Sequence, residues 1–143
     1  MQGKRNGLAL QWAMSALSGA SLLLLLAKEV HAATYVVDDT ADAVDANPGD
    51  GVCASASPSA GCTLRAAIQE VNAAPSASGD SIELPAGTFA LSLTGSDEDA
   101  AASGDLDIST SLVLTGVSAE DTVIDGGEID RVLTKQIDQI IHH

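Results

Sequence analysis

The chain has 143 residues, a formal net charge of −14 and an apolar fraction of 45%. That length suits one modest domain, and so negative a charge excludes a nucleic-acid binder, which needs a basic stripe to contact phosphates. Aromatic residues make up only 2% of the chain, which excludes an aromatic-lined carbohydrate groove and predicts a core of Ile, Leu, Val and Ala.

Residues 1–32 have the layout of a secretory signal peptide, which is expected to be helical. Lys4 and Arg5 provide a basic start, residues 8–27 are largely apolar, and Ala32 is a small residue suited to a cleavage site. This pattern predicts export, so the protein is expected outside the cell, at the cell surface or in the periplasm. The alternative is an uncleaved anchor, because the apolar stretch is nearly long enough to span a bilayer. Contact with a membrane is then expected only through this segment.

The remainder of the chain is more acidic than the whole. Residues 1–32 carry a net charge of +2, which leaves −16 for residues 33–143, where the cations are Arg65, Arg131 and Lys135. A charge of this size keeps a domain soluble and monomeric.

The first elements expected after the signal are a short strand at residues 34–38 and a loop at residues 39–61. Cys53 and Cys62 are the only cysteines. Because an exported chain meets an oxidising compartment, we expect them to form a disulfide that closes a small loop. Such a bond stabilises a fold by about 2–3 kcal/mol.

The same loop and its approach are rich in aspartate. Ca²⁺ is a hard cation that prefers oxygen ligands, so the sequence offers a candidate calcium site. The candidate ligands are Asp38, Asp42, Asp45 and Asp50. Their spacing does not match an EF-hand loop, and aspartate-rich turns are also common without a metal, so solubility alone is the alternative explanation.

One helix is predicted, at residues 62–73. Thr63 can cap its first turn, and Pro75 and Gly79 end it. Four apolar residues share one helical face: Leu64, Ala67, Ile68 and Val71. So short a helix is marginal alone, so this face is expected to cover other elements.

From residue 80 onward, apolar residues alternate with polar ones in short runs separated by turns, which is typical of an all-β region. Strands are expected around residues 82–84, 89–93, 106–108, 112–114, 123–124 and 132–133. The apolar positions recur at steps of 24 (Ile82 to Leu106), 23 (Phe89 to Leu112) and 20 (Leu112 to Val132). Steps of that size suggest the coils of a solenoid, each burying its inward residues against the next. An open sandwich is the alternative.

Residues 62–67, Cys-Thr-Leu-Arg-Ala-Ala, resemble the CSLREA motif. That motif names a domain at the N-terminus of secreted bacterial proteins with a right-handed parallel β-helix, the pectin-lyase-like fold. The motif positions present are Cys62, Thr63, Leu64, Arg65 and Ala67. Residues 50–53 resemble the first half of the family's cysteine pair, and residues 82–88 and 124–127 resemble its first coils. The resemblance covers residues 34–133.

The chain departs from the family in two places. Ala66 stands where the motif has Glu, so the reciprocal bond of a capping box is absent. Residues 134–143 break the alternation, which suggests that the chain is a fragment of a longer protein. The resemblance therefore implies four parts: a signal peptide (1–32), an Asp-rich cysteine loop with a capping helix (33–79), first coils (80–133) and an atypical tail (134–143).

The fold expected from this resemblance is all-β, the start of a right-handed parallel β-helix whose exposed end is covered by the short helix with a polar outer face. The function it implies is a non-catalytic capping module of an exported surface protein used for adhesion or display, with an unspecified surface or polysaccharide ligand. No catalytic residue is predicted, and calcium is the one candidate cofactor.

The alternative is a fragment of a polysaccharide lyase or glycoside hydrolase of the same fold. A lyase needs cations to neutralise a uronate, and few remain after the signal. A hydrolase needs two carboxylates that face each other across a groove. Because Asp and Glu are plentiful, such a pairing stays open. Against it, Asp105, Asp107 and Asp125 lie beside predicted turns, where aspartate is ordinary.

Overall fold

The computed structural model describes residues 31–56, 61–96, 98–127 and 131–135. These residues form seven strands and one helix, in the order β1 (Thr34–Val36), α1 (Leu64–Ala73), β2 (Asp80–Glu83), β3 (Gly87–Ala90), β4 (Leu106–Ile108), β5 (Leu112–Thr115), β6 (Thr122–Asp125) and β7 (Leu133–Lys135). The described part is therefore mostly strand with little helix, as the alternation predicts. Nearly all of the expected signal helix and most of the tail lie outside the described residues. β7 runs two residues past the boundary predicted for the coils.

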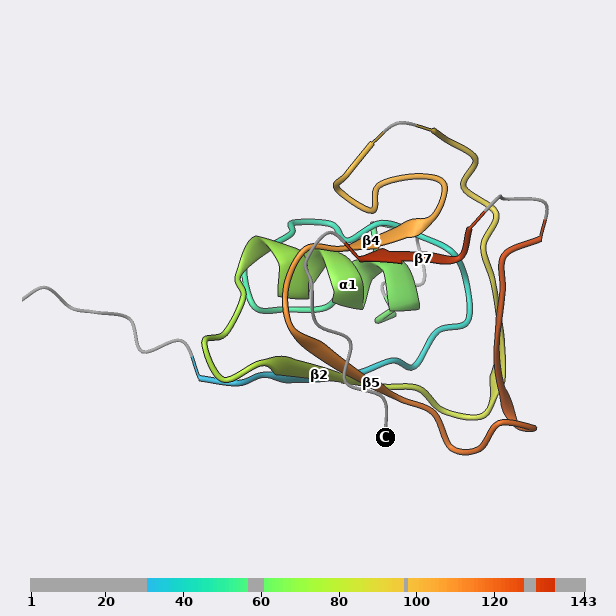
Figure 1. The fold of residues 1–143 in the computed structure, drawn as a ribbon, viewed down its shortest axis with the longest axis horizontal. Coiled ribbons are helices and arrows are strands. Elements are labelled where there is room, and N and C mark those ends of the chain that lie inside the picture. Colours follow the sequence, from blue (N-terminus) through green and yellow to red (C-terminus); the bar gives the residue numbers. More distant parts are fainter. Residues whose placement is uncertain (1–30, 57–60, 97, 128–130, 136–143) are drawn as a thin grey trace, which may run out of the picture.

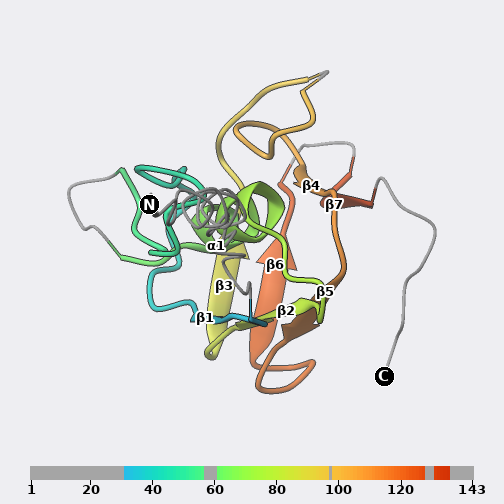
Figure 2. The ribbon, with the colours of Figure 1, turned by 90° about the vertical axis from the view of Figure 1, so that its left-hand side faces the viewer.

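The named strands form three separate sheets, and every pairing between them is parallel. The orders are β1-β2-β5, β3-β6 and β4-β7. Each sheet thus contains one strand from residues 80–108 and one from residues 112–135. The chain therefore contributes a strand to each of the three sheets in turn, in a first pass (β2, β3, β4) and again in a second pass (β5, β6, β7) (Figures 1 and 2). The open sandwich expected as the alternative, with strands joined by antiparallel hairpins, is not what these pairings form.

The paired residues of neighbouring strands are further apart in the sequence than the repeat lengths that the apolar pattern suggested. Ile82 pairs with Leu114, a step of 32 positions (82 to 114). The step is 35 positions from Phe89 to Ile124 (89 to 124) and 27 from Leu106 to Leu133 (106 to 133). The predicted steps of 20–24 were wrong because they joined strands of different sheets. Alternation identifies which residues point inward, but the unequal loops between strands decide which residues meet.

Helix α1 begins where Thr63 supplies its cap. The Thr63 backbone is extended, and the Ala66 amide donates to its Oγ1 over 3.1 Å, so the expected cap is confirmed. The helix ends at Ala73, two residues before Pro75, which cannot continue it. Cys62 and Thr63 precede the first helical residue, which makes the helix two residues shorter than predicted.

The apolar face of α1 packs against the strands of the first pass, β2 and β4. Leu64, Ile68 and Val71 are at most 2% exposed and belong to one core with Ile82 and Leu106. In Figure 2, α1 lies on the side of β1 and β3, while β5 and β7 lie on the opposite side. The expected packing of the helix is thus confirmed, and it covers one end of the stacked strands.

Candidate functional site

Residues 43–56 fold back on themselves beside α1, and we call this segment the cysteine hairpin. The Ala46 amide donates to the Ala54 carbonyl over 2.8 Å, and the Ala56 amide donates to the Val44 carbonyl over 2.9 Å. The loop predicted at residues 39–61 therefore contains a short antiparallel contact rather than only irregular turns.

A disulfide ties this hairpin to the start of α1. Cys53 and Cys62 are joined with their Cα atoms 5.0 Å apart, as the sequence predicts. Cys62 directly precedes the capping Thr63, and its amide donates to Oδ1 of Asp38 over 2.7 Å. The carbonyl of Cys62 accepts from the amides of Asp38 and Asp39. The strand segment, the hairpin and the helix therefore meet at one residue.

The polar side of α1 is buried, contrary to the solvated outer face expected of a cap. Arg65 is 1% exposed, Gln69 is 7% exposed and Glu70 is fully buried. The cause is tertiary, because the cysteine hairpin and neighbouring loops lie over this side of the helix. Each of the three side chains finds its hydrogen-bond partners in those segments, as buried polar groups must.

Arg65, one of the motif residues, forms a buried ion pair with Asp42. Its Nε lies 2.5 Å from Oδ1 of Asp42, and neither side chain is more than 1% exposed. Its two terminal nitrogens donate to the carbonyls of Ala101, over 3.0 Å, and Gly104, over 2.8 Å. The Arg65 guanidinium thus links the helix to the residue just before the cysteine hairpin and to the loop before β4.

Asp42 is equally well connected. Besides Arg65, its Oδ2 accepts from the amides of Ser92, over 2.6 Å, and Leu93, over 2.8 Å. Burial by itself would raise the pKa of this carboxyl, but the hydrogen bonds from Arg65, Leu93 and Ser92 outweigh it and hold the pKa below its ordinary value. The pair is therefore ionised at neutral pH and joins three segments distant in sequence.

Glu70 is held by the turn of the cysteine hairpin. Its two carboxylate oxygens accept from the amides of Gly49, over 2.7 Å, and Gly51, over 2.9 Å. Both glycines have positive φ, at 94° and 86°, a conformation that glycine adopts without strain. A Cβ at Gly49 would lie 3.1 Å from Cβ of Ala73, so the turn approaches the helix closely. Sequence reasoning missed this contact because a Gly-Asp-Gly run is typical of any turn.

Two further side chains of α1 fix its neighbours. Oε1 of Gln69 accepts from the Asp45 amide over 2.7 Å. Nδ2 of Asn72 donates to the Asp107 carbonyl over 2.7 Å, and its Oδ1 accepts from the Ser109 amide over 3.0 Å. The sequence carried no sign of these contacts, because a polar residue on a predicted helix is expected in water.

The four candidate calcium ligands are engaged in hydrogen bonds within the protein. Asp38 accepts from Cys62, and Asp42 is paired with Arg65. Asp45 accepts from the amides of Asn47 and Ala54, and Asp50 accepts from the Val52 amide and the Asn47 side chain. Among the residues that the structure describes, no three His, Cys, Asp or Glu side chains are placed to hold a metal ion. The calcium prediction gains no support from this arrangement.

The three carboxylates weighed for a hydrolase are spread over different elements. Asp105 accepts from the Thr134 hydroxyl, and the exposed Asp125, at the end of β6, accepts from the Gly127 amide. Asp107 lies in β4 and is only 4% exposed. Burial raises its pKa, and the charges of Asp105, Glu98 and Asp99 raise it further.

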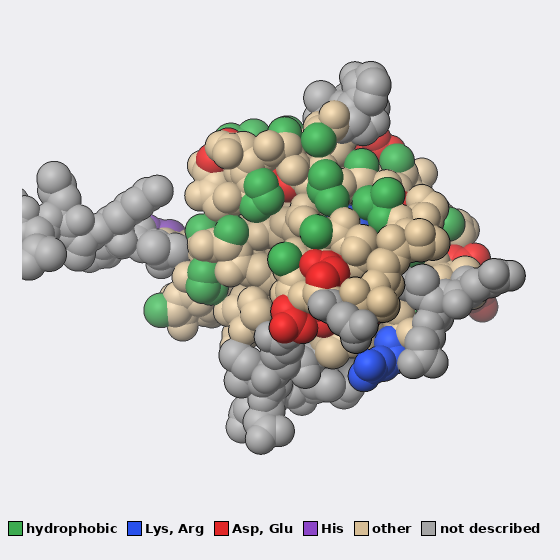
Figure 3. All heavy atoms as spheres, turned by 90° about the horizontal axis from the view of Figure 1, so that it is seen from above, with side chains coloured by type: hydrophobic (Ala, Val, Ile, Leu, Met, Phe, Trp, Pro, Cys, Tyr) green, Lys and Arg blue, Asp and Glu red, His purple; other side chains and the backbone are tan. Residues whose placement is uncertain are grey.

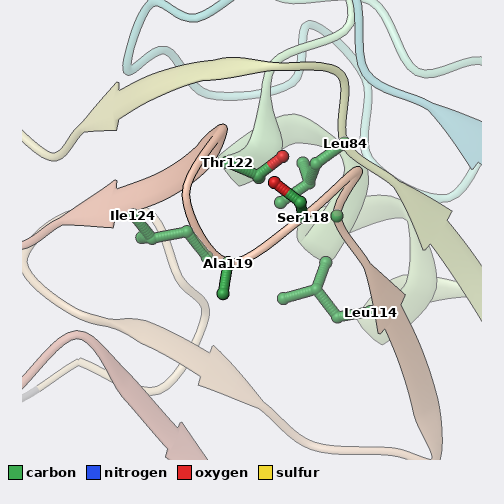
Figure 4. Close-up of a pocket in the computed structure, with 7 residues that line it drawn as sticks. Leu84, Leu114, Ser118, Ala119, Thr122 and Ile124 are labelled. Atoms are coloured by element: carbon green, nitrogen blue, oxygen red, sulfur yellow. The ribbon is translucent and has the colours of Figure 1, made fainter.

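The end of the strand stack opposite α1 is hollowed. A shallow pocket of about 310 Å³ opens there, lined by Leu84, Leu114, Gly116, Ser118, Ala119, Thr122 and Ile124. Figure 4 shows that its walls come from the end of β2, from β5, from the loop between β5 and β6, and from β6. Leu114 and Ile124 are half-buried, whereas their partners Ile82 and Phe89 are at most 2% exposed.

The strands at this open end also have unpaired edges. Within the described residues, β5, β6 and β7 each pair with one neighbouring strand, as β1, β3 and β4 also do. On the face shown in Figure 3, acidic side chains occur in several places and basic ones gather in one. No basic stripe crosses this face.

No family model, no curated protein and no solved structure matches this chain. The resemblance to the CSLREA domain therefore stays a prediction. The helix in the described residues is too short and too polar to cross a membrane. A disulfide is compatible with an extracellular or periplasmic location, where thiols are oxidised.

Proposed function

We propose that the chain is the non-catalytic capping module at the N-terminal end of an exported, right-handed parallel β-helix, and that it starts a surface scaffold for adhesion or display. One observation carries the proposal. A helix tethered by a disulfide covers one end of a stack of parallel strands, while the other end of the same stack is open in the part of the chain that the structure describes.

The order of pairing supports the β-helix. Each of the three sheets pairs a strand of the first pass with the corresponding strand of the second pass, all in parallel. Inward residues stack in register, Ile82 on Leu114 and Phe89 on Ile124. Stacking of this kind, repeated turn after turn, is how a solenoid builds its core.

The covered end supports the capping role. An uncovered first turn would present unpaired strand edges and apolar side chains, which promote aggregation. Here Ile68 and Val71 of α1 lie on that core and are at most 1% exposed. The cysteine hairpin then buries the polar side of the helix, so the cap is two layers thick rather than one.

The open end supports continuation. The half-buried Leu114 and Ile124 stand where Ile82 and Phe89 stand in the turn before. A further coil would bury them and pair the edges of β5, β6 and β7.

The polysaccharide-lyase alternative is weakened by the position of Arg65. A lyase base must reach its substrate, and this guanidinium is buried and hydrogen-bonded to Asp42 and two carbonyls. The binding role therefore rests on the outer surface of the scaffold, and its ligand is a surface or polysaccharide component.

The capping role is tested by Ile68→Asp in the whole chain. A carboxylate forced into this buried site should lower the melting temperature and the solubility, since an unpaired buried charge costs several kcal/mol, on the order of the total stability of a small domain. Val113→Asp is the matched control, because Val113 is 62% exposed on β5. Equal solubility and melting of the two variants would contradict the proposal.

The β-helix itself is tested by extension. A second copy of residues 80–135, appended after Lys135, should stack on the open end, raise the melting temperature and slow amide exchange in β5 and β6. A scrambled segment of the same composition is the control. An appended copy that leaves exchange in β5 and β6 as fast as the scrambled segment does would refute a continuing solenoid.

A further inference from the structure

The cysteine hairpin covers α1 through a small set of contacts. The Asp45 amide binds Gln69, the Gly49 and Gly51 amides bind Glu70, and the Ala43 carbonyl accepts from Oγ1 of Thr63 over 2.6 Å. The Cys53–Cys62 bond is the one side-chain covalent link between the hairpin and the start of the helix, and the backbone also joins the two. The hairpin is held against the helix at its turn and at its returning arm.

Glu70 makes this attachment all-or-none. It is fully buried, and the hydrogen bonds to its carboxylate come from the hairpin turn. If the turn moves away, the carboxylate loses both donors together, and water must replace them. The turn and the returning arm are thus expected to leave the helix together rather than in parts.

The disulfide is placed to control that release. It joins the returning arm to the residue before the helix cap, so its loss frees the arm from the helix start. Cys53 is half-buried while Cys62 is 7% exposed, which leaves the Cys53 side as the more accessible one for an incoming thiolate. α1 also contacts the strands through Leu64, Ile68 and Val71, whose side chains are not part of this bond, although Cys62 belongs to the same core.

We propose that the Cys53–Cys62 disulfide is a redox switch: reduction releases the cysteine hairpin from α1 while the helix stays on the strands, and oxidation closes the hairpin again. A dithiol attacks one sulfur, forms a mixed disulfide, and leaves as its own cyclic disulfide, so the protein gains two electrons and two protons as two thiols. The switch does not depend on the proposed β-helix. Its biological role would be to attach the hairpin to the helix only after export, and this role rests on the proposed export.

The experiment follows amide exchange of the intact chain at neutral pH with dithiothreitol and then with its oxidised form. On reduction, exchange in the hairpin, including the Gly49 and Gly51 amides, should accelerate at least about tenfold, while exchange in β2 and β3 changes little. Reoxidation should restore the slow exchange. Thiol counting confirms that the bond was opened.

Two results would overturn the switch. Unchanged amide exchange in a fully reduced chain would show that the disulfide does not keep the hairpin on the helix. Equal acceleration of exchange in the hairpin and in β2 and β3 would show that the disulfide stabilises the whole fold. A variant with both cysteines changed to serine should exchange like the reduced chain under either condition. Failure of that variant to fold would also count against the proposal, which requires the strands to persist without the bond.

Discussion

The two ends of the strand stack use similar side chains in opposite environments. At the end covered by α1, Ile82 and Leu106 are fully buried. One turn further on, their register partners are less protected, since Leu114 is half-buried and Leu133 is 41% exposed. The residue types are nearly the same, so burial is decided by position in the stack and by what covers each end.

The comparison also separates two kinds of polar residue. Near the covered end, charged side chains such as Asp42, Arg65 and Glu70 are buried and bind segments distant in sequence. At the open end, neutral or exposed polar groups make the contacts, as Ser118 does with Asp121 over 2.8 Å and Thr122 does with the Pro85 carbonyl over 3.1 Å. The covered end therefore depends on buried charges, and the open end does not.

The largest effect is expected from Asp42→Asn. Removing one partner of a buried ion pair leaves Arg65 uncompensated, which should lower the free energy of unfolding by about 3–5 kcal/mol at neutral pH, measured by urea denaturation. Because folding lowers the pKa of Asp42, its contribution is complete above the ordinary Asp range and is lost as the pH falls through the lowered value. The difference between the two chains should shrink in acid.

Glu120→Gln is the control for this variant, because Glu120 is exposed in the loop before β6. It should change stability by less than about 0.5 kcal/mol. An Asp42→Asn chain as stable as this control would mean that the covered end does not depend on its ion pair.

The difference in burial between the two ends can be tested by shortening the side chains of one register pair, Ile82 and Leu114. Ile82→Ala should cost about 3–5 kcal/mol, and Leu114→Ala about half as much, because a half-exposed side chain loses less burial. Both changes remove the same number of carbon atoms, so urea denaturation compares them directly. Equal losses would show that the second turn is covered as well as the first.

A smaller effect is expected at the helix cap. Thr63→Ala removes the acceptor for the Ala66 amide and the donor to the Ala43 carbonyl, and should cost about 1–2 kcal/mol in thermal unfolding. Thr63→Ser keeps the hydroxyl and should cost much less, which isolates the hydrogen bond from the methyl group. If both variants melt alike, the cap bond contributes nothing.

The smallest effect is expected at Asp107. Folding raises its pKa, so the ionised form opposes folding and this penalty grows as the pH rises from the ordinary Asp range through the raised value. Asp107→Asn should therefore stabilise slightly at neutral pH, and the gain should vanish in acid. Asp125→Asn, at the exposed end of β6, is the control and should change stability by less than about 0.5 kcal/mol. A destabilised Asp107→Asn chain at neutral pH would contradict this assignment.

The local elements could be predicted because they depend on short-range patterns. Alternation located every strand after residue 80, and Thr63 with Pro75 bounded the helix to within two residues. The cysteine pair could be predicted because only two cysteines are present. Each of these features is fixed by neighbouring residues or by simple counting.

The register and the polar contacts could not be predicted in the same way. Ile82 meets Leu114 because of the lengths of several intervening loops, which no periodicity records. Glu70 is buried because a turn about twenty residues earlier folds over the helix. A pattern of single residues cannot distinguish such a glutamate from one in water.

By itself, the sequence determined where strands, helix and disulfide lie, because backbone propensity, capping and alternation act over a few residues. Only the tertiary structure decided that the strands pair in parallel in three sheets, that one end is covered and the other open, and that the charges of the helix are buried. Those outcomes depend on the path of the loops through space, which brings together groups that are 20 to 50 positions apart.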